Sequence, residues 1–595
     1  MESDQLIEQR RTRQPVLPAR PGHAEGAYDI YPVHDIGPGR IVEGHGGIAG
    51  LLPTRGLIVV DGYPGVFWQE FRDRLTAAWQ AAGVSSTWVD VATALRPEAE
   101  VAQLVAPYLG GDDPIFGTAF TGDLAEFFDP AKLAALAPSD TDVTVLYGPG
   151  AALAGWDGTL VWLEVPKNEI QFRARAGQPT NLGTTMVANP KAAYKRNYFV
   201  DWPVVGRHKQ CLLAAIDVLV DEQRPAQPTA IGGSDLRAAL SQLVRTPLRA
   251  RPWFEPGAWG GQWMKQRMPQ LPQDVPNYAW SFELIAPENG LVLASDGLAL
   301  EVPFDTLLFH DNPAMLGEAA ERFGPEFPIR FDFLDTFAGG NLSVQVHPWP
   351  DYIREHFGER FTQDETYYIL DAEPGARVYL GFQEDIDPAA FRAALEHSVA
   401  AAEEVDIERY VQTHPAAKHD LFLIPHGTIH CSGINNLVLE ISATPYIFTF
   451  KLYDWLRLDL DGKPRPINIE RGMANLDFER KGERVTREFI SHPEVLERGA
   501  GWQLVHVPTH PLHFYDVHRI ELFGPGHYEF PTNDSVQVMS LVEGQAVTVE
   551  AGGKARTYHY AETFVVPAAA GQVRLSADGP VKVLTAFIKP GRGPR

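Results

Sequence analysis

The pattern of apolar residues changes once along this chain, near residue 280. Before that point, short apolar runs alternate with segments whose apolar residues recur at helical spacing. After it, β-branched and aromatic runs follow one another closely, separated by Gly, Pro and Asp. Alternating strands and helices are typical of an α/β domain with a mainly parallel sheet, whereas closely spaced strands are typical of sandwiches and barrels. The sequence therefore predicts two regions of different fold class.

The first region shows the alternation of strands and helices. The run Gly56–Asp61 (GLIVVD) predicts a strand. The spacing of Phe67, Phe71, Leu75 and Trp79 predicts a helix directly after it. Further predicted elements are strands at Val143–Tyr147 and Thr159–Val165 and a closing helix at Leu212–Val220.

These patterns divide the chain into five predicted parts. Residues 1–45 are polar and rich in Gly, Pro and Arg, which predicts an irregular arm, and residues 46–225 form the α/β domain. The Pro- and Arg-rich residues 226–252 are predicted as a linker with one helical pattern. Two β domains follow at 253–480 and 481–595, the first with helical patches at Asp387–Ala402 and Val405–Gln412.

Charge and cysteine content exclude several classes of protein. The 76 acidic residues outnumber the 51 basic ones, for a formal net charge of −25. Such a chain is not expected to bind nucleic acid or an anionic membrane, although a local basic pocket for a small phosphorylated ligand is compatible with it. Two cysteines exclude a disulfide scaffold and a cysteine-based zinc cluster.

Targeting signals are not apparent in the sequence. No apolar run approaches the roughly 18 residues that a membrane-spanning helix needs. The first residues, MESDQLIEQRRTRQP, lack the apolar core of a signal peptide. We therefore expect a cytoplasmic protein without a membrane partner, and both a monomer and a homo-oligomer stay open.

The segment Asn341–Leu370 contains the residues most suited to chemistry. Alternate side chains of a strand share a face, so Gln345 and His347 of SVQVH point one way. Glu365 follows at the start of another strand, and PHGTIH presents His430 later. Imidazole, carboxylate and amide oxygen together suit Zn²⁺ or a similar divalent ion, although a lone strand histidine is more often structural.

The segments GNLSVQVHPWPDY, ETYYILDAEPGARVYLGF and PHGTIH resemble type I mannose-6-phosphate isomerases, which have a cupin fold. The resemblance extends from about Trp259 to about Pro590. It implies that 253–480 is a metal-binding cupin isomerase domain and that 481–595 is a companion cupin-like domain without metal. It also implies one Zn²⁺ per chain, with these ligands: Gln345, His347, Glu365 and His430.

The implied reaction is the interconversion of mannose 6-phosphate and fructose 6-phosphate through an enediolate. A Lewis-acid ion stabilises the negative charge on the oxygens of C1 and C2. Lys451 in FKLYDW stands where the family often has an arginine, so it is the first candidate to move the proton, with Arg465 second. Candidates for binding the sugar phosphate are Arg457, Arg471 and Lys265.

The first region faintly resembles P-loop kinases, in particular uridine-kinase-like proteins. Asp61–Gly65 (DGYPG) stands where a phosphate-binding loop would follow the first strand, but the Lys and Ser/Thr of that motif are absent. Val161–Pro166 and Lys195–Asp201, with Arg173 and Arg175 between them, add to the resemblance. We expect a degenerate P-loop domain with a structural, oligomerising or nucleotide-sensing role.

Two other functions are compatible with the sequence. A metal-dependent cupin oxygenase uses two histidines and one carboxylate, but the amide ligand and the wide gap from His347 to Glu365 disfavour it. The second alternative is a non-catalytic sugar-phosphate sensor. It stays open because Lys451 stands where the isomerase family often has an arginine. The histidines within His506–Arg519 do not place three side chains on one face, so we expect an irregular connection there.

Overall fold

The computed structural model describes residues 8–22, 26–111, 113–139, 141–185, 189–286, 288–443, 448–459 and 462–591. The chain forms two compact units. Unit 1 contains Met1–His23, Tyr31–Leu243 and Pro287–Asp311. Unit 2 contains Ala24–Ile30, Val244–Ala286 and Asn312–Arg595.

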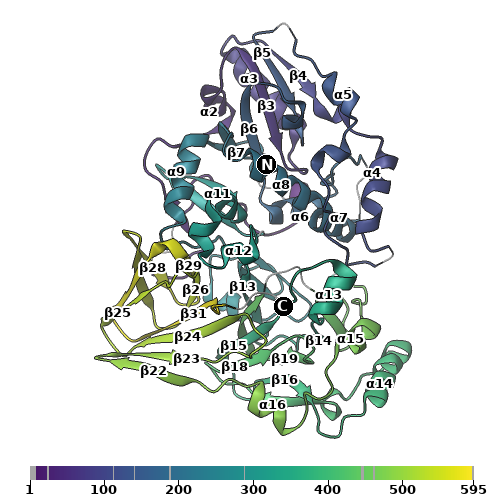
Figure 1. Ribbon diagram of the computed structural model, residues 1–595, viewed down its shortest axis with the longest axis vertical. Coiled ribbons are helices and arrows are strands. Elements are labelled where there is room, and N and C mark those ends of the chain that lie inside the picture. Colours follow the sequence, from purple (N-terminus) through teal and green to yellow (C-terminus); the bar gives the residue numbers. More distant parts are fainter. Residues whose placement is uncertain are drawn as a thin grey trace. The chain divides into compact units, whose positions relative to one another are not determined.

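Unit 1 is built around a seven-stranded sheet (Figure 1). Five neighbouring strands are parallel, in the order β7-β6-β3-β5-β4, and β8 and β2 extend the sheet in antiparallel fashion. The central strands are almost wholly buried, as expected for a parallel sheet covered on both faces. The strands are β2 (Ile41–Glu43), β3 (Gly56–Gly62), β4 (Ser86–Asp90), β5 (Val143–Tyr147), β6 (Thr159–Glu164), β7 (Val218–Asp221) and β8 (Thr229–Gly232).

Helices connect these strands, which confirms the predicted α/β class of the first region. Helix α3 (Trp68–Ala81) buries Phe71, Leu75 and Trp79, the residues whose spacing predicted it. The other helices are α2 (Gly44–Leu51), α4 (Glu98–Val105), α5 (Pro130–Ala134), α6 (Lys167–Arg175), α7 (Pro190–Arg196), α8 (Trp202–Leu212) and α9 (Gly233–Leu243).

Unit 1 differs from the sequence predictions in its boundaries. Part of the expected arm forms β1 (Val33–Asp35), which pairs with β11 (Gly290–Ser295), and β11 pairs with β12 (Leu298–Pro303). Residues 287–311, predicted within the first β domain, therefore belong to unit 1. The boundary lies in α11 (Asp305–Leu316), which kinks at Asp311.

Two further predictions in this region differ from the structure. The expected linker 226–252 is packed into the core, since β8 buries Ile231 and α9 buries Leu240. Helix α9 itself confirms the helical pattern predicted within that stretch at Asp235–Val244. The segment Leu212–Val220 is not a helix, because α8 ends at Leu212 and β7 begins at Val218. In both places, long-range packing rather than local composition decides the structure.

The first half of unit 2 contains two antiparallel sheets, in agreement with the mostly-β prediction. The six-stranded sheet consists of β18 (Leu421–Ile424), β15 (Glu365–Ala372), β20 (Asn436–Ala443), β13 (Ile329–Asp335), β10 (Trp280–Leu284) and β9 (Trp253–Glu255). The five-stranded sheet consists of β17 (Val411–Pro415), β16 (Arg377–Phe382), β19 (His430–Ser432), β14 (Val344–Val346) and β21 (Phe450–Tyr453).

Short helices connect these strands. The predicted helical patch at Asp387–Ala402 is confirmed as α14 (Pro388–Ala401), where the Asp387 side chain caps the first turn. The patch at Val405–Gln412 has only a single 3₁₀ turn, Ile407–Arg409, before β17. The remaining helices are α10 (Trp263–Arg267), α12 (Ala320–Phe323), α13 (Pro350–Phe357), α15 (Ile469–Asn475) and α16 (Glu483–Glu488).

The last part of the chain forms two more antiparallel sheets that share an apolar core, including Leu541, Phe564 and Leu575. One contains β22 (Glu494–Gly499), β23 (Trp502–His506), β24 (Tyr515–Leu522), β31 (Val581–Ile588), β26 (Gln537–Glu543) and β29 (Thr563–Val566). The other contains β25 (Gly526–Pro531), β30 (Gln572–Ala577), β27 (Ala546–Ala551) and β28 (Lys554–His559).

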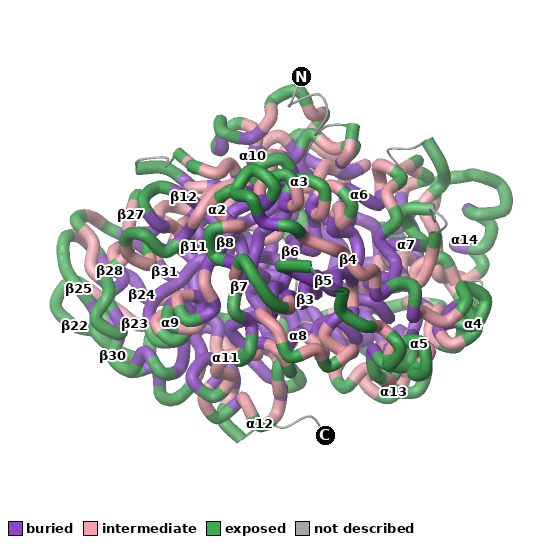
Figure 2. The backbone as a smooth tube through the Cα atoms, turned by 90° about the horizontal axis from the view of Figure 1, so that it is seen from above, coloured by how far each residue is buried: buried purple, intermediate pink, exposed green. Residues whose placement is uncertain are grey.

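The most buried residues lie on the central strands of the sheets. Figure 2 shows buried positions along the central strands and exposed positions on outer elements such as α14 and the edge strand β22. None of the described helices is both long and apolar enough to cross a bilayer.

The connection before β24 is irregular between His506 and Tyr515, as expected. His506 on β23 and His518 on β24 are nevertheless cross-strand partners. His513 is fully buried and stacks on Tyr515 at a centroid distance of 5.2 Å. No described residue makes a hydrogen bond to either of its ring nitrogens. Burial lowers the pKa of His513 to about 3.

The neutral state of His513 predicts a pH dependence of stability. The imidazole is neutral in the folded chain but protonates near pH 6.5 when unfolded, so its stabilisation is complete above that pH and is lost as the pH falls toward 3. The loss is about 1.4 kcal/mol per pH unit. We expect His513→Phe to reduce the fall in urea midpoint between pH 7.5 and pH 5.0 relative to the unmodified chain. Equal falls in both proteins would contradict this prediction.

Candidate metal centre

A row of three side chains crosses the five-stranded sheet of unit 2. Gln345 of β14 pairs with His430 of β19 on one side and with Lys451 of β21 on the other. Directly opposed residues of antiparallel strands share a face, with their Cβ atoms about 5 Å apart. The row therefore presents an amide, an imidazole and an ammonium group on one face of the sheet.

The other sheet supplies a carboxylate to this face. His347 lies two positions after Gln345 and so faces the same way, while Glu365 is the first residue of β15. Oε2 of Glu365 lies 3.2 Å from Nε2 of His347, and Oε1 of Glu365 lies 2.7 Å from Nε2 of His430. All three residues are buried, and their ligand atoms lie within 4.8 Å of one another.

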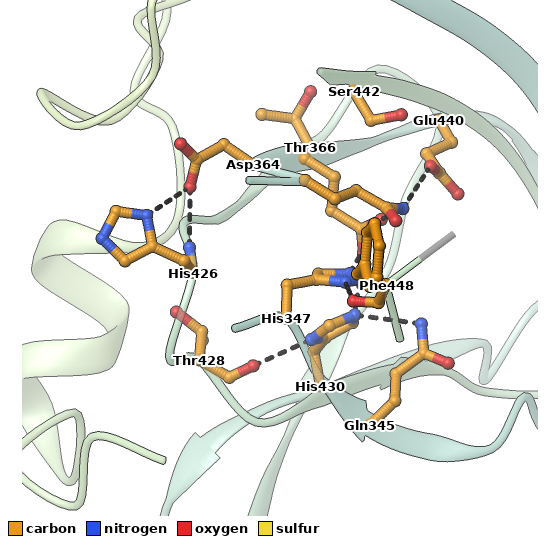
Figure 3. Close-up of polar contacts among 12 residues, drawn as sticks. Gln345, His347, Asp364, Thr366, His426, Thr428, His430, Glu440, Ser442 and Phe448 are labelled. Carbon is orange, nitrogen blue, oxygen red and sulfur yellow. Dashed lines mark hydrogen bonds and ion pairs between the residues drawn. The ribbon is translucent and has the colours of Figure 1, made fainter. Parts of the chain in front are cut away.

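Backbone carbonyls orient both imidazole rings. Nδ1 of His347 lies 3.1 Å from the carbonyl oxygen of Phe448, and Nδ1 of His430 lies 2.9 Å from that of Thr428 (Figure 3). A proton on each Nδ1 satisfies these carbonyls and leaves both Nε2 lone pairs directed at the Glu365 carboxylate. This is the arrangement in which histidines bind metal ions.

The cluster fits a divalent cation. Nε2 of His347 and Oε1 of Glu365 are buried, and neither atom makes a hydrogen bond within the described part of the chain. Two imidazole lone pairs and a carboxylate repel one another unless a cation or a proton lies between them. Burial lowers the pKa of His347, but the Glu365 carboxylate outweighs it and raises that pKa. Burial raises the pKa of Glu365, but the two imidazoles hold it well below its usual value.

Gln345 stands next to this cluster. Its Nε2 lies 3.2 Å from Nε2 of His430, and the side chain is half-buried. A half-turn of the amide would direct its oxygen toward the cluster instead, as the sequence prediction requires. Two imidazole nitrogens, one carboxylate and one amide oxygen form a donor set suited to Zn²⁺ or a related ion.

Further buried charges on the inner face of the six-stranded sheet favour a cation. Asp332 of β13 and Glu440 of β20 are cross-strand partners, and Arg330 lies two positions from Asp332. Asp332, Glu440 and Glu365 thus place three carboxylates near the single guanidinium of Arg330. Burial and the carboxylate of Glu440 raise the pKa of Asp332 well above its usual value, and burial and Glu365 raise that of Glu440. A divalent cation would compensate the excess of negative charge.

Lys451, the first catalytic candidate, is half-buried at the end of the row. Among the described residues, no hydrogen bond or ion pair occupies its Nζ. Burial, followed by the neighbouring Arg465, lowers the pKa of Lys451 to about 8. The ammonium group is therefore available for chemistry on the face that carries Gln345 and His430.

Two of the predicted arginines share one carboxylate. Nη2 of Arg457 and Nη1 of Arg465 each lie 2.7 Å from a different oxygen of Asp454. Asp454 and both arginines lie close enough to Lys451 to shift its pKa, so the structure gathers three cations near one acid. Sequence reasoning missed Asp454, although it stands inside the quoted FKLYDW segment.

The remaining two candidates lie elsewhere in unit 2. Arg471 on α15 packs over the rings of Phe357 and Phe450, at 5.0 and 6.0 Å from their centroids. Lys265 on α10 donates through Nζ to the carbonyl oxygen of Val275 at 2.7 Å. No contact within the described residues joins Lys265 to the cluster, and its binding role stays a prediction.

Sequence reasoning also missed the buried polar residues behind the cluster. Gln363 and Glu440 are 2% and 5% exposed. The signal for Glu440 is polar alternation within apolar strands, as in IRFDFLD at β13 and NLVLEISA at β20. A buried polar residue in such a strand is informative because it needs a specific partner. Gln363 lies just before β15 and shows no such pattern.

Comparisons with known proteins give one match for the N-terminal region and others to mannose-6-phosphate isomerases. Residues 44–245 match a family model described as a domain of unknown function (DUF8485). Mannose-6-phosphate isomerase ManA of Bacillus subtilis is 28% identical over 253 residues, which cover 42% of this chain and 74% of that protein. Mannose-6-phosphate isomerase of Streptococcus mutans is 28% identical over 216 residues, 36% of this chain and 63% of that protein.

A solved structure adds to these comparisons. The crystal structure of mannose 6-phosphate isomerase from Bacillus subtilis covers 58% of this chain and 100% of its own, with a TM-score of 0.46 and 19% identity. The sequence relatives support a relationship between this chain and the mannose-6-phosphate isomerases.

The geometry predicts the effect of removing one imidazole. We expect His347→Ala to lose the bound divalent ion, because the variant keeps only two of the three clustered ligands, while the fold is retained. Metal content by mass spectrometry, with circular dichroism for the fold, checks this. His397→Ala, which changes an exposed histidine paired with Glu403, is the matched control. Stoichiometric metal in His347→Ala would contradict the assignment.

Proposed function

We propose that this chain is a zinc-dependent aldose–ketose isomerase that interconverts mannose 6-phosphate and fructose 6-phosphate. The observation that carries the proposal is the buried cluster of His347, Glu365 and His430, on the same face as Lys451. The relatives named mannose-6-phosphate isomerase support the choice of substrate.

His347, Glu365, His430 and Gln345 would hold one zinc ion. When bound, the ion supplies Lewis-acid stabilisation of negative charge on the oxygens of C1 and C2. The two histidines and the carboxylate come from different sheets, so the fold fixes their spacing before substrate arrives.

Lys451 is our candidate for proton transfer between C2 and C1. A base must take the proton from C2 of the aldose and return it to C1, while a second proton moves between the two oxygens. A half-buried lysine with no bound partner, next to the cation Arg465, suits this task better than a solvated lysine.

The substrate phosphate needs cations that the protein leaves accessible. Arg457 and Arg465 share Asp454 and therefore keep donors for a further anion. Arg471 and Lys265 are the additional candidates. Arg457 and Arg465 thus bring two cations together in a chain whose formal charge is −25.

For the N-terminal domain we propose a degenerate P-loop relationship and a structural or regulatory role. Glu222 accepts a hydrogen bond at 3.3 Å from the backbone N–H of Phe67, at the start of α3, and pairs with Arg173 at 2.6 Å. A helix N-terminus is where a phosphate group would bind, and here an internal carboxylate lies beside it. This supports a domain without kinase activity.

A coupled assay with mannose 6-phosphate tests the proposed function. We expect fructose 6-phosphate production that a chelator abolishes and added zinc restores. Lys451→Met should lower kcat by at least ~100-fold with zinc content unchanged, since general acid–base catalysis contributes that much. Lys418→Met, at an exposed lysine over Tyr560, is the control and should keep full activity.

The other outcomes separate the alternatives. Full turnover in Lys451→Met would exclude this lysine as the base. Tight binding of mannose 6-phosphate by the zinc-loaded protein without turnover would overturn the isomerase in favour of a sensor. Metal-dependent oxygen consumption without isomerisation would overturn it in favour of an oxygenase.

A further inference from the structure

Gln363 connects the metal cluster to the buried charges behind it. It lies two positions before Glu365 and is 2% exposed. Its Nε2 lies 3.2 Å from Oε2 of Glu365 and 3.4 Å from Oε1 of Glu440. One amide nitrogen thus contacts two carboxylates from neighbouring strands.

The chemistry of the two acceptors fixes the orientation of this amide. An ionised carboxylate only accepts hydrogen bonds, and an amide nitrogen carries two N–H donors. The nitrogen of Gln363 must therefore face Glu365 and Glu440, with one N–H for each. The amide also acts as a neutral spacer, since it donates to one oxygen of each of the two buried carboxylates.

Glu440, the second acceptor of Gln363, is itself held by hydrogen bonds. Glu440 accepts a hydrogen bond from Nη2 of Arg330, and Nε of Arg330 donates to Oγ of Ser442 at 3.0 Å. Arg330, Glu440 and Ser442 are all buried on β13 and β20. The position of Gln363 is therefore set by groups that do not touch the cluster themselves.

We propose that Gln363 is a positioning residue for the metal-binding carboxylate. Its hydrogen bond to Oε2 fixes the rotation of Glu365, so that Oε2 faces His347 and Oε1 faces His430. Partners of metal ligands commonly change metal affinity by 10- to 100-fold when they are removed. The inference rests on the proposed function only in requiring a divalent ion at the cluster.

The test compares zinc affinity in the full-length protein and in Gln363→Leu, by competition with a chromogenic chelator. We expect a zinc dissociation constant about 10- to 100-fold higher in the variant. Loading with Co²⁺ gives a second readout, since the visible spectrum of Co²⁺ reports the geometry of its ligands. We expect that spectrum to change in the variant. Gln363→Met, unbranched and closer in shape, replaces the leucine variant if that one fails to fold.

Thr366→Val is the matched control. Thr366 is buried next to Glu365, and its hydroxyl donates to the carbonyl oxygen of Ile441 at 3.2 Å, away from the cluster. This variant loses a buried hydrogen bond and should keep the zinc affinity and Co²⁺ spectrum of the unmodified protein. Equal zinc affinity and identical Co²⁺ spectra in Gln363→Leu and the unmodified protein would overturn the positioning role.

Failure of the proposed function gives a different result. If the unmodified protein binds zinc but does not isomerise mannose 6-phosphate, the isomerase proposal fails while the affinity difference at Gln363 still supports positioning. If the unmodified protein and every variant bind neither zinc nor Co²⁺, both the isomerase proposal and the positioning role of Gln363 are overturned.

Discussion

The Glu365 carboxylate between the imidazoles of His347 and His430 is the contact on which the site depends. Glu365 begins a strand of one sheet, while the histidines belong to or directly follow strands of the other, so this contact joins the inner faces of both sheets. Carbonyl groups hold the ring orientation from behind. The lone pairs of the two imidazoles and of the carboxylate therefore point toward one another in the interior. Their attraction for a cation is stronger there than at the surface, because the effective dielectric constant is lower.

The surroundings of this contact depart from the usual composition of a β core. Buried faces of antiparallel sheets are normally apolar, yet here Arg330, Asp332 and Glu440 lie behind the cluster. Unpaired buried carboxylates are costly, so a cation bound at the proposed site would also stabilise the fold. Gln363 couples the two groups of charges through hydrogen bonds and without a charge of its own.

Unit 1 pairs several of its buried acids directly with cations of the same unit: Glu164 with Lys209, Glu222 with Arg173, and Asp305 with Lys167. Asp221 of β7 differs, because the amide of Gln223 donates both to it and to Glu301. The three ion pairs satisfy their charges internally, whereas unit 2 leaves an excess of carboxylates beside two imidazoles. This excess of carboxylates supports the metal site that we propose in unit 2.

Local sequence determined the class of each region, helix α3, and the shared face of Gln345 and His347, because side-chain periodicity depends only on neighbouring residues. Residues 287–311 share the strand pattern of the later region, but pairing with β1 brings them into unit 1. The contact of Glu365 with both histidines and the bridge through Gln363 depend on which strands pair. The family resemblance implied that Glu365 and the histidines meet, but the periodicity of the chain did not. Only the tertiary structure decided the geometry of these contacts, since pairing between distant segments leaves no periodic signal.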